Sequence, residues 1–179
     1  MSDGLIPRRY AKALYKLAVE NGDATEIYEQ LKQLDFRYAA IDELKRAVLN
    51  PYIPDEDKGR ALLEAAGARP GSSLDKFLLL VIRNNRATFL RKIALAYVAI
   101  YRAEHNIAKV EIATASELPQ EEVNSILEVV KKRLGNMTLE VERSIDPSLI
   151  GGFTVKVDDI LLDASIKNEL KTLRLKLQK

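Results

Sequence analysis

The chain has 179 residues, of which 47% are hydrophobic, and its 28 basic and 26 acidic residues leave a formal charge of only +2. This length and apolar content suffice for one large domain or two small ones. A near-neutral charge argues against a polyanion-binding protein, and the absence of cysteine excludes disulfide, thiol and iron–sulfur chemistry. The first residues contain no apolar signal core, so we expect neither export nor membrane insertion.

The first predicted helix extends from Pro7 to Gly22, two residue types that favour a helix start and a helix stop. Its polar side chains gather in a stripe of about 120°, which leaves roughly 240° of apolar surface, whereas an ordinary surface helix buries about half that arc. Two interpretations remain open. The helix is either central to its own bundle, or it has one face on its core and a second face for a partner.

Further helices are predicted over residues 25–40, 42–49 and 55–67, and Ser73 is positioned to cap the helix that begins at Leu74. Short breaks rich in proline and glycine separate these helices. Short connections are typical of a compact antiparallel bundle.

The stretch from Leu74 to Asn106 is strongly apolar. It contains an unbroken run of six apolar residues at 77–82 and another of nine at 93–101. Because each helical residue turns by about 100°, six consecutive apolar positions surround a helix completely. Both runs are shorter than the roughly 20 residues of a membrane span, so they predict two helices inside a soluble bundle.

After Asn106 the apolar period changes from that of a helix to that of a strand. The predicted elements are a strand at 109–114, a helix at 119–135, strands at 139–145 and 153–157, a short buried strand at 160–162, and a final helix at 166–177. We therefore expect a mainly α protein, in which residues 1–106 form a six-helix bundle and residues 107–179 form a small α+β domain.

Catalytic, cofactor and metal motifs are missing from this sequence. It has no glycine-rich phosphate loop, and His105 is its only histidine, which we interpret as a solvated residue at a helix end. The acidic run 55–57 is better explained as a helix start than as a calcium loop, and Asp158, Asp159 and Asp163 as polar residues around a strand. We therefore predict no catalytic, cofactor or metal site.

Basic residues cluster at 131–133 and in the last helix, and such runs are usually solvated helix faces. Nucleic-acid binding stays an alternative, although no aromatic platform accompanies these residues.

Three motifs in the sequence carry a resemblance to a known family. They are Arg9-Tyr10-Ala11-Lys12-Ala13-Leu14, the stretch FLLLVIRNNR at 77–86, and IDPSLIGGF at 145–153 followed by DASI at 163–166. Together they resemble the delta subunit of F-type ATP synthase, the family of the mitochondrial oligomycin sensitivity-conferring protein, over nearly the whole chain. Asn85 departs from the pattern, since the family often has glycine there, and we expect a less tight turn at this position.

The resemblance implies a non-catalytic subunit of the peripheral stalk, or stator, which resists rotor torque during proton-driven ATP synthesis. In such proteins the helical bundle binds the N-termini of alpha subunits, chiefly through its first and fifth helices. The C-terminal domain binds b subunits. The resemblance also implies no cofactor, and a peripheral location at the cytoplasmic face of the energy-coupling membrane through the complex, without direct insertion. The alternative is a two-domain nucleic-acid- or ribosome-associated helical adaptor.

Site residues follow from the positions that match the family motifs. Gly151 and Gly152 are expected to support a sharp bend between strands. Leu173 and Leu177 lie outside the motifs, on the last helix, and are candidate contacts for a b subunit, although the apolar stripe of this helix is no wider than packing within its own domain needs. For Tyr10 and Leu14 of the first helix, a second interpretation is equally open, namely that their side chains fill the bundle core. The candidate contacts for the alpha N-terminus are Tyr10, Ala13, Leu14, Phe77, Leu80 and Asn84.

Overall fold

The structure is a computed structural model that describes residues 4–157 and 160–177. It divides into two compact units, Met1–Glu104 and His105–Lys179. The protein is mainly helical, with a small four-stranded sheet in its C-terminal part, and this confirms the predicted class.

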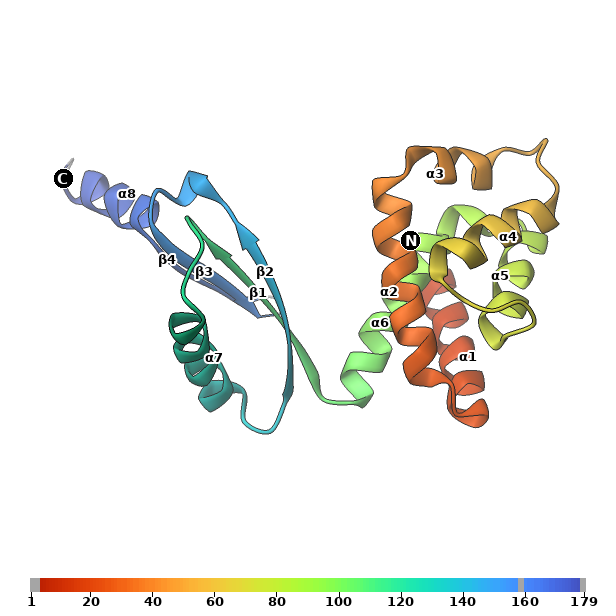
Figure 1. The fold of residues 1–179 in the computed structure, drawn as a ribbon, viewed down its shortest axis with the longest axis horizontal. Helices are drawn as coiled ribbons and strands as arrows, with labels where there is room; N and C mark the ends of the chain where they lie inside the picture. Colours follow the sequence, from red (N-terminus) through yellow and green to blue (C-terminus); the bar gives the residue numbers. More distant parts are fainter. Residues whose placement is uncertain (1–3, 158–159, 178–179) are drawn as a thin grey trace. The chain divides into compact units, whose positions relative to one another are not determined.

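The first unit consists of helices joined by short turns (Figure 1). These helices enclose one apolar core. Several of its side chains are almost completely shielded from solvent, among them Leu14, Leu31, Leu62, Leu78 and Tyr97. These residues come from five different helices, so the core is shared by nearly the whole unit. The elements are α1 (Leu5–Asn21), α2 (Ala24–Ala40), α3 (Asp42–Leu49), α4 (Asp55–Ala66), α5 (Ser73–Arg83), the 3₁₀ turn η1 (Ala87–Phe89) and α6 (Leu90–Glu104).

The start of α5 differs by one residue from the prediction. Ser72, and not Ser73, is the N-cap, because its extended backbone lets its Oγ accept a hydrogen bond of 3.2 Å from the Asp75 N–H. Ser73 lies inside the helix and donates to Asp23 Oδ2 at 2.6 Å. The second serine therefore ties α5 to the turn between α1 and α2.

The end of α5 is a tight turn, so the expectation of a looser turn at Asn85 was wrong. Asn85 has a φ of 55°, and its N–H donates to the Ile82 carbonyl at 2.8 Å. The Arg86 N–H donates to the Val81 carbonyl at 2.9 Å. Asparagine tolerates the left-handed conformation better than other non-glycine residues, so it closes the helix in the way that glycine does.

Replacing Asn85 by alanine should lower the free energy of unfolding by about 1 kcal/mol, because the alanine Cβ disfavours the left-handed backbone. Urea denaturation followed by circular dichroism measures this difference. Asn85→Gly is the matched control and should be at least as stable as wild type. An alanine variant as stable as the glycine variant would contradict this account of the turn.

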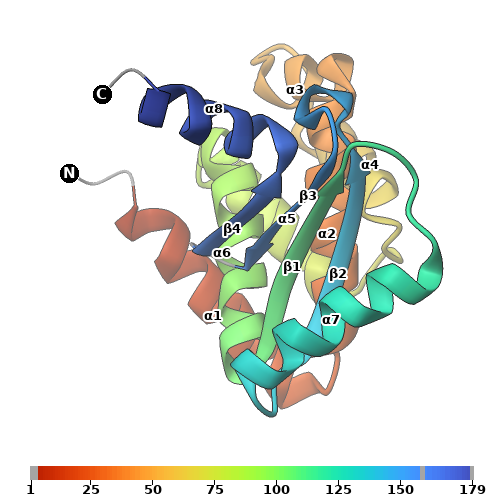
Figure 2. The same ribbon diagram turned by 90° about the vertical axis from the view of Figure 1, so that its left-hand side faces the viewer.

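The second unit is a four-stranded sheet with one helix on a face and one helix beyond its edge (Figure 2). The strand order is β2-β1-β3-β4, with β1 parallel to β2 and the other pairs antiparallel. Helix α7 makes the crossover between the two parallel strands, as their pairing requires. The elements are β1 (Ile107–Thr114), α7 (Gln120–Leu134), β2 (Thr138–Ile145), the 3₁₀ turn η2 (Pro147–Leu149), β3 (Gly152–Val157), β4 (Ile160–Ser165) and α8 (Ile166–Leu177).

The core of this unit lies between α7 and the central strands. Val110 and Ile112 of β1 and Val155 of β3 pack against Val123 and Val130 of α7. The alternation of buried and half-buried residues along β1 is the period that the sequence predicted for that strand.

We predicted that the apolar run 160–162 is a buried strand, and this was wrong. It is an exposed strand at the edge of the sheet. Ile160, Leu161 and Leu162 are 63%, 61% and 53% exposed. Among the described strands, β4 pairs only with β3, and the α7 core does not extend to it. An apolar run alone does not distinguish a buried strand from an exposed edge strand.

Candidate partner-binding surfaces

An apolar groove of about 350 Å³ lies between α1 and α5 in the first unit. Below it is called the α1–α5 groove. The structure brings all the candidate contacts for the alpha N-terminus together here, although the two helices are more than 50 residues apart in the sequence. The lining residues are Arg9, Tyr10, Ala13, Leu14 and Leu17 from α1, and Phe77, Leu80 and Asn84 from α5.

An aromatic contact and a hydrogen bond join the two walls of this groove. The rings of Tyr10 and Phe77 meet edge to face, with centroids 6.3 Å apart. The Asn84 side-chain Nδ2 donates to the Tyr10 hydroxyl at 3.1 Å. Because Phe77 is only 6% exposed, the pair fixes the spacing between α1 and α5 before any partner binds.

The lining residues divide into a floor and a rim. Leu14 is 1% exposed, so for this residue the interpretation as core is correct, and it serves as the floor of the groove. Leu80 is 51% exposed and Leu17 is 40% exposed. Ala13 is exposed, and its small side chain keeps the groove open between them. Leu17 was missed as a site residue, although it lies seven positions after Tyr10 and therefore on the same helix face.

A second apolar surface lies on the second unit. Leu173 is 54% exposed on α8, whereas the side chain of Leu177 lies outside the described residues. Helix α8 follows β4 and lies away from α7 in both views (Figures 1 and 2). The exposed apolar side chains that we call the β4–α8 surface are Ile160, Leu161, Leu162, Ile166, Leu170 and Leu173. Ile160 and Leu162 pair with Val157 and Val155 on the α7 face of the sheet, whereas Leu161 lies on the other face, so both faces of this edge strand carry exposed apolar side chains. Exposed apolar residues on an edge strand and on the helix that follows it mark a candidate interaction surface.

The two adjacent glycines have different roles. Gly152 has a φ of 74°, and a Cβ at this position would collide with the backbone carbonyl oxygen of Ala164 on β4. A Cβ on Gly151 would meet only the side chain of Ile166, with its Cδ1 2.5 Å away, and that side chain can move. The bend before β3 therefore depends on Gly152 far more than on Gly151.

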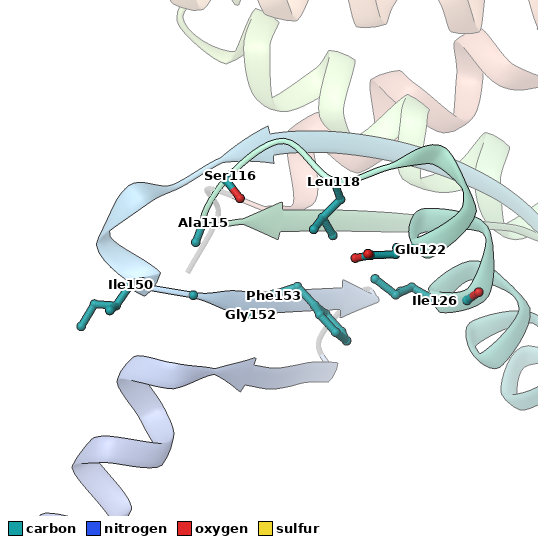
Figure 3. Close-up of a pocket in the computed structure, with 10 residues that line it drawn as sticks. Ala115, Ser116, Leu118, Glu122, Ile126, Ile150, Gly152 and Phe153 are labelled. Atoms are coloured by element: carbon teal, nitrogen blue, oxygen red, sulfur yellow. The ribbon is translucent and has the colours of Figure 1, made fainter.

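A cavity of about 560 Å³ opens between the start of α7 and the start of β3 (Figure 3). Leu118, Ile126 and Phe153 form its apolar wall, and Glu122 supplies a carboxylate, while Ile150 points away. Sequence reasoning missed it, because its residues come from three separate segments and share no motif. Within residues 4–157 and 160–177, no group of three or more histidine, aspartate or glutamate side chains could hold a metal ion.

Comparison with known proteins identifies the family. A model of the ATP synthase delta (OSCP) subunit family matches residues 6–177. The chain belongs to this family. It is 36% identical over 172 residues to the ATP synthase subunit delta of Phocaeicola vulgatus, and the matched region covers 96% of this chain and 92% of the relative. It is 32% identical over 173 residues to the sodium-ion-specific ATP synthase subunit delta of Propionigenium modestum, and this match covers 97% of the chain and 98% of the relative.

A solved structure shares the fold of this delta-family chain. A chain of the mitochondrial ATP synthase hexamer of Toxoplasma gondii superimposes with a TM-score of 0.72 at 19% identity, with 97% of both chains covered. As a delta (OSCP) subunit, the protein is a component of the peripheral stalk of an ATP synthase. The comparisons give no support to the nucleic-acid or ribosome-associated alternative. No helix in the described part of the chain is long and apolar enough to cross a membrane.

Proposed function

We propose that this delta-family subunit is a non-catalytic adaptor that links the catalytic head to the b subunits of the peripheral stalk. The bundle of residues 1–106 binds the N-termini of alpha subunits, and the domain of residues 107–179 binds the b subunits. The link holds the head still against rotor torque during proton-driven ATP synthesis. The protein acts at the cytoplasmic face of the membrane, to which it is attached only through the complex.

The observation that carries the proposal is the α1–α5 groove. Its floor is buried and its rim presents half-exposed leucines from both helices, a composition that suits an apolar ligand. An amphipathic helix places apolar side chains at positions i, i+3, i+4 and i+7, and such a row fits a groove between two helices. We infer that the N-terminal helix of an alpha subunit binds here.

The rim leucines explain how this contact becomes strong. Full burial of a leucine side chain contributes about 1.5–3 kcal/mol, and Leu17 and Leu80 each have roughly half of their surface left to bury. The partner buries its own apolar anchors against them. The hydrogen bond between Asn84 and Tyr10 and the contact between Tyr10 and Phe77 already join the two walls, which lowers the cost of ordering them on binding.

Calorimetric titration of the full chain with a synthetic peptide of the cognate alpha-subunit N-terminus tests this part of the proposal. We expect one peptide to bind per chain, with a negative heat-capacity change from apolar burial. A peptide with the same composition in scrambled order is the control. Absence of binding by a chain with a normal melting transition would contradict the assignment.

The β4–α8 surface is the proposed contact for the b subunits. It combines the strand β4, which pairs only with β3 among the described strands, with apolar residues of α8. Lys167, Lys171 and Arg174 are exposed on the same helix. Apolar anchors with a charged rim are the usual composition of a protein interface. Leu173 belongs to this surface, and we extend the proposal to Leu177.

Leu173→Glu should weaken binding of the soluble part of the b subunits by about tenfold or more, because it replaces an apolar anchor with a carboxylate that loses its water on binding. Ile145→Glu is the matched control, since Ile145 is 59% exposed on β2, at the opposite edge of the sheet. Sedimentation velocity measures both affinities. Equal loss in the two variants would place the contact elsewhere.

A further inference from the structure

Helix α1 also borders a second groove, on its side next to α6. This α1–α6 groove has a volume of about 560 Å³. Half-buried Tyr15 and Ile100 form part of its lining, together with exposed Leu5. It is distinct from the α1–α5 groove, with which it shares a single lining residue, Arg9.

The charge of the α1–α6 groove is strongly one-sided. Arg8, Arg9, Lys12 and Lys16 line it, whereas Glu104 is its one acidic lining residue. No carboxylate among the described residues lies within 4.0 Å of any of these four cations. The chain as a whole is nearly neutral, at +2, so the groove is a local concentration of positive charge.

The spacing of the cations favours an elongated ligand. Arg8, Lys12 and Lys16 follow one another at every fourth position, so their Cα atoms are about 6 Å apart along the axis of α1 and extend over about 12 Å. Like charges at this spacing destabilise an isolated helix. A helix that lies along α1 presents carboxylates with the same repeat, so each of the three cations can pair with its own carboxylate.

We propose that the α1–α6 groove binds an acidic amphipathic helix of a neighbouring subunit. Its carboxylates pair with Arg8, Lys12 and Lys16, and its apolar side chains contact Tyr15, Ile100 and Leu5. The inference goes beyond the proposed function, since it concerns a second ligand of different chemistry on another face of α1. The α1–α5 groove selects apolar anchors, and the α1–α6 groove selects negative charge.

Fluorescence anisotropy with a designed probe tests this inference. The probe is a labelled 16-residue helical peptide with glutamate at every fourth position and leucine beside it, and a second peptide carries lysine in place of glutamate. We expect the acidic probe alone to bind the full chain, with an affinity that falls as salt rises. The triple variant Arg8→Gln, Lys12→Gln, Lys16→Gln should bind about tenfold more weakly, the sum of three exposed ion pairs.

Two controls keep this outcome separate from the proposed function. The variant Lys45→Gln, Arg46→Gln, Lys76→Gln loses the same charge from exposed positions elsewhere and should bind within twofold of wild type. Leu80→Glu changes the α1–α5 groove and should leave probe affinity unchanged. Two results would overturn the inference. One is an equal loss of probe affinity in both triple variants. The other is displacement of the probe by inorganic triphosphate added at the same total negative charge as the probe.

A photo-crosslinking amino acid at Ile100 in the assembled ATP synthase identifies the natural ligand. Mass spectrometry should find it joined to a subunit segment with acidic residues at helical spacing. Adducts confined to segments without such a pattern would also overturn the inference.

Discussion

Gly152→Asp should unfold the second unit while the first unit stays folded. The backbone at Gly152 is left-handed, and any Cβ there meets the Ala164 carbonyl oxygen, which is part of the β3–β4 ladder and cannot move freely. The expected loss in free energy of unfolding is about 3 kcal/mol or more, because backbone strain and the steric collision add. Hydrogen exchange of the full chain, resolved by peptide, measures the loss unit by unit.

Gly151→Ala is the matched control for this prediction. Its Cβ meets only the mobile end of Ile166, so the expected change is below about 1 kcal/mol. The Gly152 variant should also lose binding to the b subunits and keep binding to the alpha peptide. A Gly152→Asp chain whose sheet amides stay as protected as in wild type would contradict the role of this glycine.

Leu80→Glu should weaken binding of the alpha-subunit peptide by about a hundredfold, which corresponds to about 3 kcal/mol. The substitution replaces a half-exposed rim leucine with a carboxylate, which must lose its water when an apolar ligand covers the groove. The folded chain itself should be little affected, since Leu80 is 51% exposed. Titration calorimetry measures the affinity, and thermal melting checks the fold.

Leu95→Glu is the control for Leu80→Glu. Leu95 is 47% exposed on α6 and does not line the α1–α5 groove, so the same chemical change there should leave peptide affinity within twofold. Equal affinity of the two variants would show that the peptide binds outside the groove.

Much of the fold could be predicted from periodicity and capping residues. The glycines at 22 and 67 end α1 and α4, each with a left-handed backbone, as their positions suggested. The change of period after Asn106 marked the start of the sheet. Helix caps and periods are local properties, so a single sequence is enough to show them.

Tertiary context accounts for what the sequence could not show. The run 160–162 has the composition of a buried strand, but burial depends on whether a helix covers the strand, and α7 does not. For Leu14, sequence alone left core and partner contact equally open, since a helix with a wide apolar arc does not reveal which side its own bundle covers. The Figure 3 cavity depends on three distant segments, and no local pattern predicts such a meeting.

The central claim is that one chain holds the head and the stalk at the same time. Size-exclusion chromatography with light scattering of purified catalytic head, soluble b subunits and this chain tests it most directly. We predict a single complex with all three components, from which Leu80→Glu releases the head and Leu173→Glu releases the b subunits. A chain that binds only one of the two at a time, or a head and b complex that forms equally well without the chain, would contradict the account.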